Sequence, residues 1–274
     1  MTEQLRFLLW PDGAPGAKGD TPADCPDVTL TFPESHQAKP WSCVVVCPGG
    51  GYSGKAAHEA APIARWLNSL GLAAAVVQYR VAPYRYPVPA DDVRRAIRLL
   101  RAGADAWNIN PAQIAVLGFS AGGHCAMTAA TIFDSGRPDA QDPAERQNSR
   151  PDALIACYPV VTMMSKRHHG SMLNLLADAQ GQVDPQLQQD LSLENRVTPD
   201  TPPTFLWHTA DDQAVPVENS LDFAAALRRQ LVPFELHVFP HGRHGLALAN
   251  DDPVVGQWKE LCRKWLRGLG FSAS

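Results

Sequence analysis

Short apolar runs alternate along the chain with longer stretches in which apolar residues recur every three or four positions. The short runs, rich in valine, isoleucine, leucine and alanine, predict strands at 28–32, 43–47, 72–79, 114–119, 153–158, 204–208 and 234–239. The periodic stretches predict amphipathic helices at 58–71, 90–107, 121–133 and 217–232. A last helix is expected at 254–267, with Gly268 as its stop signal.

This alternation indicates one α/β domain over residues 1–274. Strands that are apolar throughout, separated by helices, are typical of a mostly parallel sheet covered by helices on both faces. Crossovers in such a sheet are right-handed, and ligands bind beyond the carboxyl ends of its strands. We therefore look for chemistry just after each predicted strand.

Residues 161–203 depart from the alternation, because they are polar and irregular. Two interpretations stay open from the sequence: a long connector, or a small cap over the site. Either fits inside the same domain.

Composition and charge narrow the function. With 45% hydrophobic and 19% charged residues the chain falls in the globular range. A net charge of −4 and a pI near 6.1 disfavour nucleic acid as a partner and favour small neutral ligands. The apolar run at 7–10 is too short for a signal peptide, and no run approaches 18 apolar residues. We expect a cytoplasmic protein with no membrane segment.

The six cysteines do not predict disulfides. Cys43, Cys47, Cys125 and Cys157 lie in or beside apolar runs, where free cysteine behaves as a small buried hydrophobe. In a strand, Cys43 and Cys47 would lie about 13 Å apart, too far to bridge. A reducing compartment is the simpler inference.

The segment GFSAGGH contains a G-x-S-x-G motif between a predicted strand and a predicted helix. A sharp turn there would hold Ser120 in a strained conformation at the edge of the sheet, while Gly118 and Gly122 let neighbouring backbone pass closely. In this context the motif favours a nucleophilic serine over a packing turn.

A nucleophilic serine needs a histidine base and a carboxylate that orients it. In this fold the expected order is serine, acid, histidine. Asp211 and Asp212 follow one predicted strand, and His241 and His244 follow the next. The residues alone do not choose within either pair, and the unused members are explained as cap, turn or loop residues.

Several segments together resemble the small α/β-hydrolase esterases, a carbohydrate-esterase group that includes acetyl xylan esterases and related acyl esterases. The likeness covers nearly the whole chain and is carried by LLWPDGAPGA, CPGGGYS, YRVAPYRYPVPADDVRRAIRLLR, GFSAGGH, HTADDQAVPVENS and HGRHGLALA. The resemblance implies that the acid of D-x-x-V-P is Asp212 and that the base is His244. The chain departs from the group's pattern at Pro48, where the better-known H-G-G-G loop has histidine, and at Leu246, where an aromatic residue is expected.

The glycines after the second predicted strand admit two interpretations, because residues 49–55 also spell G-x-x-x-x-G-K. A phosphate-binding loop needs serine or threonine after that lysine, and the chain has Ala56. An oxyanion loop fits better: Gly50 and Gly51 leave their amides accessible and would join that of Ala121 around a developing negative charge.

Other histidines receive structural interpretations. His58 and Glu59 begin an H-E-x-x-H motif, but Pro62 stands in place of its second histidine. His168 and His169 are expected in a solvated loop. His124 follows the predicted nucleophile by four residues, and we expect it to serve packing or hydrogen bonding.

These observations predict a serine carboxylesterase that hydrolyses short-chain acyl esters, with acetylated sugars as the class that the resemblance implies and with no cofactor or metal. The alternatives are an amidase or peptidase with the same triad, and a hydrolase-fold protein that binds a ligand without turnover. Pocket-lining residues are expected among Tyr52, Tyr84, Tyr86 and Tyr158, although core or rim positions explain them equally well. The sequence does not give the oligomeric state.

Overall fold

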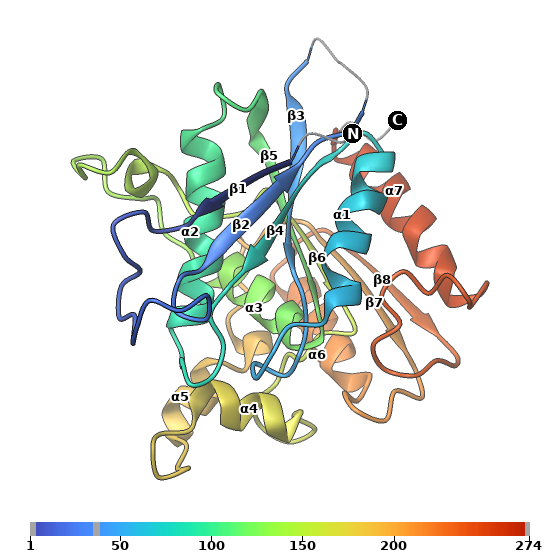
Figure 1. Ribbon diagram of the computed structural model, residues 1–274. Helices are drawn as coiled ribbons and strands as arrows, with labels where there is room; N and C mark the ends of the chain where they lie inside the picture. The colour runs from blue at the N-terminus through green and yellow to red at the C-terminus, as the bar shows by residue number, and fades with distance from the viewer. Residues whose placement is uncertain (1–3, 35–38, 272–274) are drawn as a thin grey trace.

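The computed structural model describes residues 4–34 and 39–271, and a single eight-stranded sheet runs through them (Figure 1). Its spatial order is β1-β2-β4-β3-β5-β6-β7-β8. The strands are β1 (Gln4–Leu8), β2 (Asp27–Thr31), β3 (Trp41–Cys47), β4 (Ala73–Gln78), β5 (Ile109–Phe119), β6 (Ala153–Cys157), β7 (Thr204–Thr209) and β8 (Phe234–Phe239).

The predicted mostly parallel sheet is confirmed. From β4 to β8 every neighbouring pair is parallel, while β1 and β2 pair antiparallel at one edge. β1 was not predicted, because it is a five-residue edge strand whose side chains are at best half-buried. β5 begins five residues earlier than predicted, at Ile109 beside Trp41.

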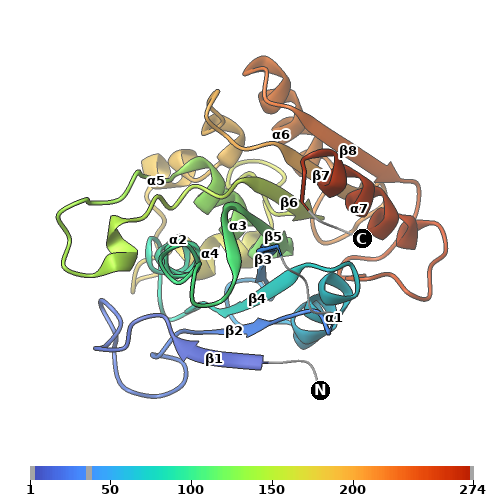
Figure 2. The ribbon, with the colours of Figure 1, turned by 90° about the horizontal axis from the view of Figure 1, so that it is seen from above.

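Helices cover both faces of the sheet (Figure 2). On one face lie α2 (Val88–Ala102), α3 (Ser120–Thr131) and α6 (Glu218–Arg229); on the other lie α1 (Ala61–Ser69) and α7 (Trp258–Gly268). The central strand β3 shows why, since all seven of its residues are buried. Cys43, Val45 and Cys47 join the core on the first face, while Val44 and Val46 join the core on the second.

Two predictions of local structure need correction. The last helix does not run from 254 to 267: a 3₁₀ turn, η4 (Val255–Gln257), precedes α7, and Gly268 is the last residue of α7 rather than a stop after it.

Residues 161–203 are less irregular than predicted. They contain α4 (His169–Leu176), α5 (Pro185–Asp190) and η3 (Leu193–Asn195), and Figure 1 shows α4 and α5 together at one end of the molecule.

All six cysteines are free, and the four predicted to be buried are buried. Burial raises the pKa of Cys43 to about 12, so this residue stays a neutral thiol inside the core. In residues 4–34 and 39–271, no helix combines the length and the apolar composition needed to cross a bilayer.

Candidate active site

Ser120 lies at the sharp turn where β5 ends and α3 begins. Its φ of 53° is in the left-handed region that non-glycine residues rarely adopt. The flanking glycines allow this turn: a Cβ on Gly118 would collide with the carbonyl of Gly122, and one on Gly122 with the carbonyl of Cys47. The strained turn predicted from the G-x-S-x-G motif is therefore present.

His244 and Asp212 meet Ser120 at the carboxyl edge of the sheet. His244 follows β8, and its Nε2 lies 2.8 Å from the Oγ of Ser120. Asp212 follows β7, and its Oδ2 lies 2.6 Å from the Nδ1 of His244. These atoms form a continuous chain of hydrogen-bonding contacts across three segments that are far apart in the sequence.

The surroundings of Asp212 favour its charged form. Its Oδ1 accepts hydrogen bonds from the amides of Ala214 at 2.8 Å and Val215 at 3.0 Å. His208 Nε2 lies 3.4 Å from its other oxygen. Burial alone would raise the pKa of Asp212, but the hydrogen bonds from His208, His244 and the Val215 amide outweigh burial and hold the pKa well below its ordinary value.

The second aspartate–histidine pair lies apart from Ser120. His241 Nδ1 is 3.0 Å from Asp211 Oδ2, and the Asp211 carboxylate also accepts from the amide of Gly242 at 2.8 Å. The side chain of His241 is 85% exposed. The structure thus brings Asp212 and His244 to Ser120 and leaves the neighbouring pair at the surface.

The glycine loop after β3 packs closely against the turn at Ser120. A Cβ on Gly49 would stand 2.8 Å from the carbonyl oxygen of Phe119 and 3.1 Å from the Cβ of Ser120. Gly50 and Gly51 have φ values of 135° and 65°, which strongly favour glycine. Glycine is therefore required for both conformation and close approach in this loop.

Three backbone amides lie in or next to this turn and the glycine loop: those of Gly50, Gly51 and Ala121. Those of Gly50 and Gly51 donate to no residue that the structure describes. Ala121 is the second residue of α3, and the first N–H groups of a helix have no partner within it. These are the three donors predicted to hold an oxyanion, and that role stays a prediction.

Of the four tyrosines predicted to line a pocket, Tyr52, Tyr84 and Tyr158 are buried and expose at most 3% of their surface, while Tyr86 is partly buried. The hydroxyl of Tyr52 lies 2.9 Å from His124 Nδ1, and that of Tyr84 donates to Asp24. Contact of these residues with a ligand stays a prediction.

His124 takes the structural position expected for it. It is fully buried, and its Nε2 donates to the carbonyl of Leu191 at 2.9 Å. Burial lowers the pKa of His124 to about 4, so the ring is neutral at pH 7.

Sequence reasoning missed the place of Glu59 beside the site, and it named Tyr158 only as a candidate for lining a pocket. The ring of Tyr158 packs edge-on against His244, with centroids 5.0 Å apart. Its hydroxyl donates to Glu59 at 2.7 Å, and Glu59 also accepts from the amide of Gly49. Neither residue carries a motif for such a role, since the contact joins positions 99 residues apart.

The prediction that His168 lies in a solvated loop is wrong, because this residue is half-buried. It caps α4 by accepting from the amide of Ser171 at 3.2 Å, and its ring approaches Gly51. Asn174, also in α4, donates to the carbonyl of Gly51 at 2.8 Å. Residues 161–203 thus contact the glycine loop, and their function as a cap stays a prediction.

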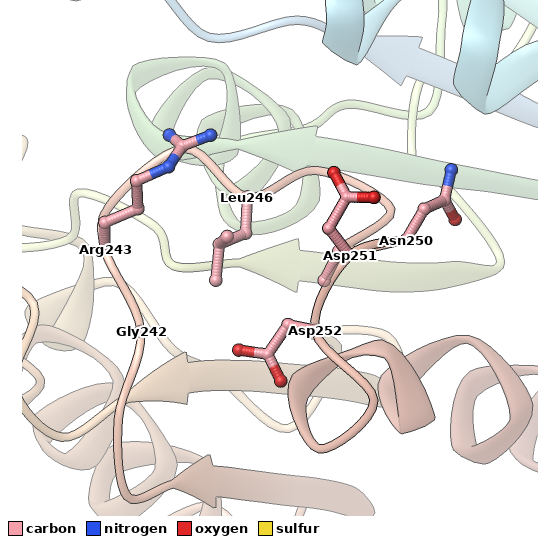
Figure 3. Close-up of a pocket in the computed structure, with 7 residues that line it drawn as sticks. Gly242, Arg243, Leu246, Asn250, Asp251 and Asp252 are labelled. Carbon is pink, nitrogen blue, oxygen red and sulfur yellow. The ribbon is translucent and has the colours of Figure 1, made fainter.

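The loop that carries His244 also borders an open cavity of about 350 Å³ (Figure 3). Arg243, Leu246 and Asp252 are among its lining residues, and Figure 3 shows the chain curving around it. None of Ser120, Asp212 and His244 lines it. We therefore do not assign this cavity to the site built on Ser120.

Fold and site together define the class of protein. A mostly parallel eight-stranded sheet, with a serine at a strained strand-to-helix turn after β5, an acid after β7 and a histidine after β8, is the α/β-hydrolase arrangement. The chain belongs to the BD-FAE family, whose model matches residues 28–227. The resemblance to esterases that the motifs carry is thereby confirmed.

Known proteins similar to the chain are named as hydrolases of esters or of xylan. A solved structure, the acetyl ester-xyloside bifunctional hydrolase from Caldicellulosiruptor lactoaceticus, is 47% identical, with a TM-score of 0.91 and 97% of each chain covered. Endo-1,4-beta-xylanase B of Butyrivibrio fibrisolvens is 38% identical over 78% of this chain. Acetylxylan esterase of Xylanibacter ruminicola is 34% identical over 82% of it. The aligned regions cover 34% and 45% of those two curated relatives.

Proposed function

We propose that this protein is a serine carboxylesterase that hydrolyses short-chain acyl esters, with Ser120 as nucleophile, His244 as base and Asp212 as the acid that orients it. The observation that carries the proposal is the contact chain from Asp212 through His244 to the Oγ of Ser120. A serine hydroxyl is a weak nucleophile at neutral pH, and a base within hydrogen-bond reach activates it.

The reaction follows from this geometry in two halves. His244 Nε2 takes the proton of Ser120 as Oγ attacks the ester carbonyl, and Asp212 stabilises the resulting imidazolium. The imidazolium then returns that proton to the departing alcohol, which leaves an acyl-serine. A water deprotonated by His244 attacks the acyl-serine, releasing the acid and restoring the hydroxyl of Ser120.

Negative charge on the carbonyl oxygen needs donors that are already in place. In the proposal the amides of Gly50, Gly51 and Ala121 supply them, since those of Gly50 and Gly51 donate to no residue that the structure describes and that of Ala121 lies in the first turn of α3. Loss of one such donor reduces turnover by about a hundred- to a thousandfold in other hydrolases. The glycine loop therefore acts as an oxyanion loop and not as a phosphate loop.

Acetyl esters of xylose-containing sugars are the proposed substrate class. Support comes from the names of the similar proteins, which refer to an acetyl ester-xyloside hydrolase and an acetylxylan esterase. Amide or peptide hydrolysis is the second candidate, because the same triad performs it. A cytoplasmic location remains part of the proposal and rests on the sequence alone.

The test is hydrolysis of p-nitrophenyl acetate by the wild type, Ser120→Ala and His241→Ala. We expect His241→Ala to match the wild type and Ser120→Ala to lose almost all turnover. Equal rates for wild type and Ser120→Ala would remove the catalytic assignment, and no hydrolysis by the wild type would remove the esterase proposal. Acetylated xylooligosaccharides, p-nitrophenyl octanoate and acetanilide then compare sugar esters, longer acyl chains and amides.

A further inference from the structure

Glu59 is a buried acidic residue that the proposed reaction does not use. It ends the 3₁₀ turn η1 (Ala57–Glu59), shortly after the glycine loop, and it is 2% exposed. Its Oε2 accepts from the amide of Gly49 at 2.7 Å, and its Oε1 accepts from the hydroxyl of Tyr158 at 2.7 Å. Burying a carboxyl group costs free energy unless hydrogen-bond donors satisfy its oxygens, and here one donor satisfies each oxygen of Glu59.

Tyr158 connects Glu59 to the histidine loop. Its hydroxyl donates to Glu59 and accepts from the amide of Ala247 at 2.9 Å, three residues beyond His244. Burial and the negative charge of Glu59 raise the pKa of Tyr158 well above its ordinary value, so the hydroxyl keeps its proton and donates.

The backbone of Tyr158 is strained, with a φ of 36° directly after β6. Strain at a non-glycine residue persists only where neighbouring contacts hold it in place. Here those contacts are the two hydrogen bonds of the hydroxyl and the edge-on packing of the ring against His244.

The turn reaches the histidine loop by a second contact. His58 Nε2 lies 3.1 Å from the carbonyl oxygen of Gly245, which directly follows His244. A carbonyl oxygen only accepts, so His58 donates. The turn therefore contacts the histidine loop directly through His58 and indirectly through Tyr158, while Glu59 holds the glycine loop through Gly49.

We propose that His58, Glu59 and Tyr158 form a brace that sets the spacing between His244 and the amides of the oxyanion loop. Glu59 and Tyr158 are positioning residues, since Glu59 contacts the glycine loop and Tyr158 acts through the histidine loop and the ring of His244. The inference rests on the proposed function. Its physical reason is that misplacement of catalytic groups by about 1 Å is enough to cost about a hundredfold in rate.

The brace is proposed to stabilise the transition state of the reaction. This effect can be distinguished from a contribution to the folding stability of the protein. A shifted glycine loop weakens the stabilisation of negative charge but leaves the rest of substrate binding intact. Turnover should fall while KM stays nearly constant. A boronic acid that adds to Ser120 mimics the tetrahedral intermediate, so its affinity should fall by a similar factor.

The experiment compares Glu59→Gln, Glu59→Ala, Tyr158→Phe and the double variant Glu59→Gln/Tyr158→Phe, with His241→Ala as a surface control. We expect kcat for p-nitrophenyl acetate to fall about ten- to a hundredfold in Glu59→Ala and Tyr158→Phe, with KM within about twofold. Glu59→Gln should lose less, because its amide oxygen still accepts from Gly49. The double variant should be little worse than Tyr158→Phe, because residues in one network are not additive.

Phenylboronic acid affinity and near-UV circular dichroism complete the test. We expect its affinity to weaken in step with kcat while the spectrum of the folded protein is unchanged. Unchanged kcat in folded variants, or losses that match only the fraction of protein unfolded, would overturn the brace. Absence of Ser120-dependent hydrolysis in the wild type would instead remove the proposed function.

Discussion

Two aspartate–histidine pairs, Asp211–His241 and Asp212–His244, lie at the same edge of the sheet. The two aspartates are adjacent in the loop after β7, and the two histidines are three residues apart in the loop after β8. The Asp211–His241 contact is 3.0 Å long and the Asp212–His244 contact is 2.6 Å. Their surroundings differ far more than their lengths, because the side chain of His241 is 85% exposed and that of His244 only 23%.

The comparison indicates that a close carboxylate is not enough for the role of base that we propose for His244. The exposed pair is in direct contact but is surrounded by solvent, where ion pairs are weak and screened. In the inner pair Asp212 is buried and held by two amides, and the far nitrogen of His244 reaches Ser120. A hydroxyl to activate and a fixed, partly water-excluded geometry distinguish the inner pair.

Replacing each histidine in turn should give the largest difference in kcat between the two pairs. We expect His244→Ala to reduce kcat for p-nitrophenyl acetate by roughly 10⁴- to 10⁶-fold, because the base is lost. His241→Ala should stay within about twofold, as expected of an exposed ion pair. Steady-state kinetics on both purified variants measure the ratio, and similar losses in the two would contradict the assignment.

Replacing each aspartate tests the orienting role. Asp212→Asn keeps the shape but no longer stabilises the imidazolium or selects the tautomer of His244, so we expect kcat to fall about 10²- to 10⁴-fold. Asp211→Asn is the matched control and should leave kcat nearly unchanged. A fall in KM rather than kcat for Asp212→Asn would argue against this role.

A third histidine, His124, shows what burial does without a carboxylate partner. Its pKa is about 4 when folded and near 6.5 when unfolded, so below pH 6.5 the unfolded chain binds a proton that the folded protein does not. Its contribution to stability is complete above pH 6.5, and about 3 kcal/mol is lost as the pH falls to 4.

Denaturant unfolding of wild type and His124→Gln between pH 7 and pH 4 measures this effect. The variant should lose less stability than the wild type over that interval. Parallel curves would show that His124 is not held neutral by burial.

The exposed pair should give the smallest effect. Asp211→Asn combined with His241→Gln should move the thermal midpoint by less than about 2 °C, since exposed ion pairs contribute little. Calorimetry at low and high salt concentration measures this shift of the thermal midpoint. A large, salt-sensitive shift would mean that the pair supports the loop of His244 and is not independent of the site.

The sequence predicted those parts of the molecule whose signals are local. Apolar strands such as Cys43 to Cys47, buried on both faces, are visible as continuous runs, and the strained turn at Ser120 is visible in its glycines. β1 was missed because a half-exposed edge strand of five residues carries little apolar signal.

Contacts between residues far apart in the chain could not be predicted from the sequence. Asp211 and Asp212 are adjacent, and only the three-dimensional path of the chain decides which one faces the histidine that reaches Ser120. The family resemblance favoured Asp212 and His244, while the residues alone favoured neither. Glu59 gave no signal either, because its partners lie 10 and 99 residues away and meet it only in the folded protein.

Covalent labelling tests the central claim most directly. The protein is treated with a fluorophosphonate probe, and the modified residue is located by peptide mass spectrometry in wild type, His241→Ala and His244→Ala. The account predicts one adduct, on Ser120, that forms equally fast in wild type and His241→Ala and far more slowly in His244→Ala. Labelling at another residue, or equal rates in all three proteins, would contradict it.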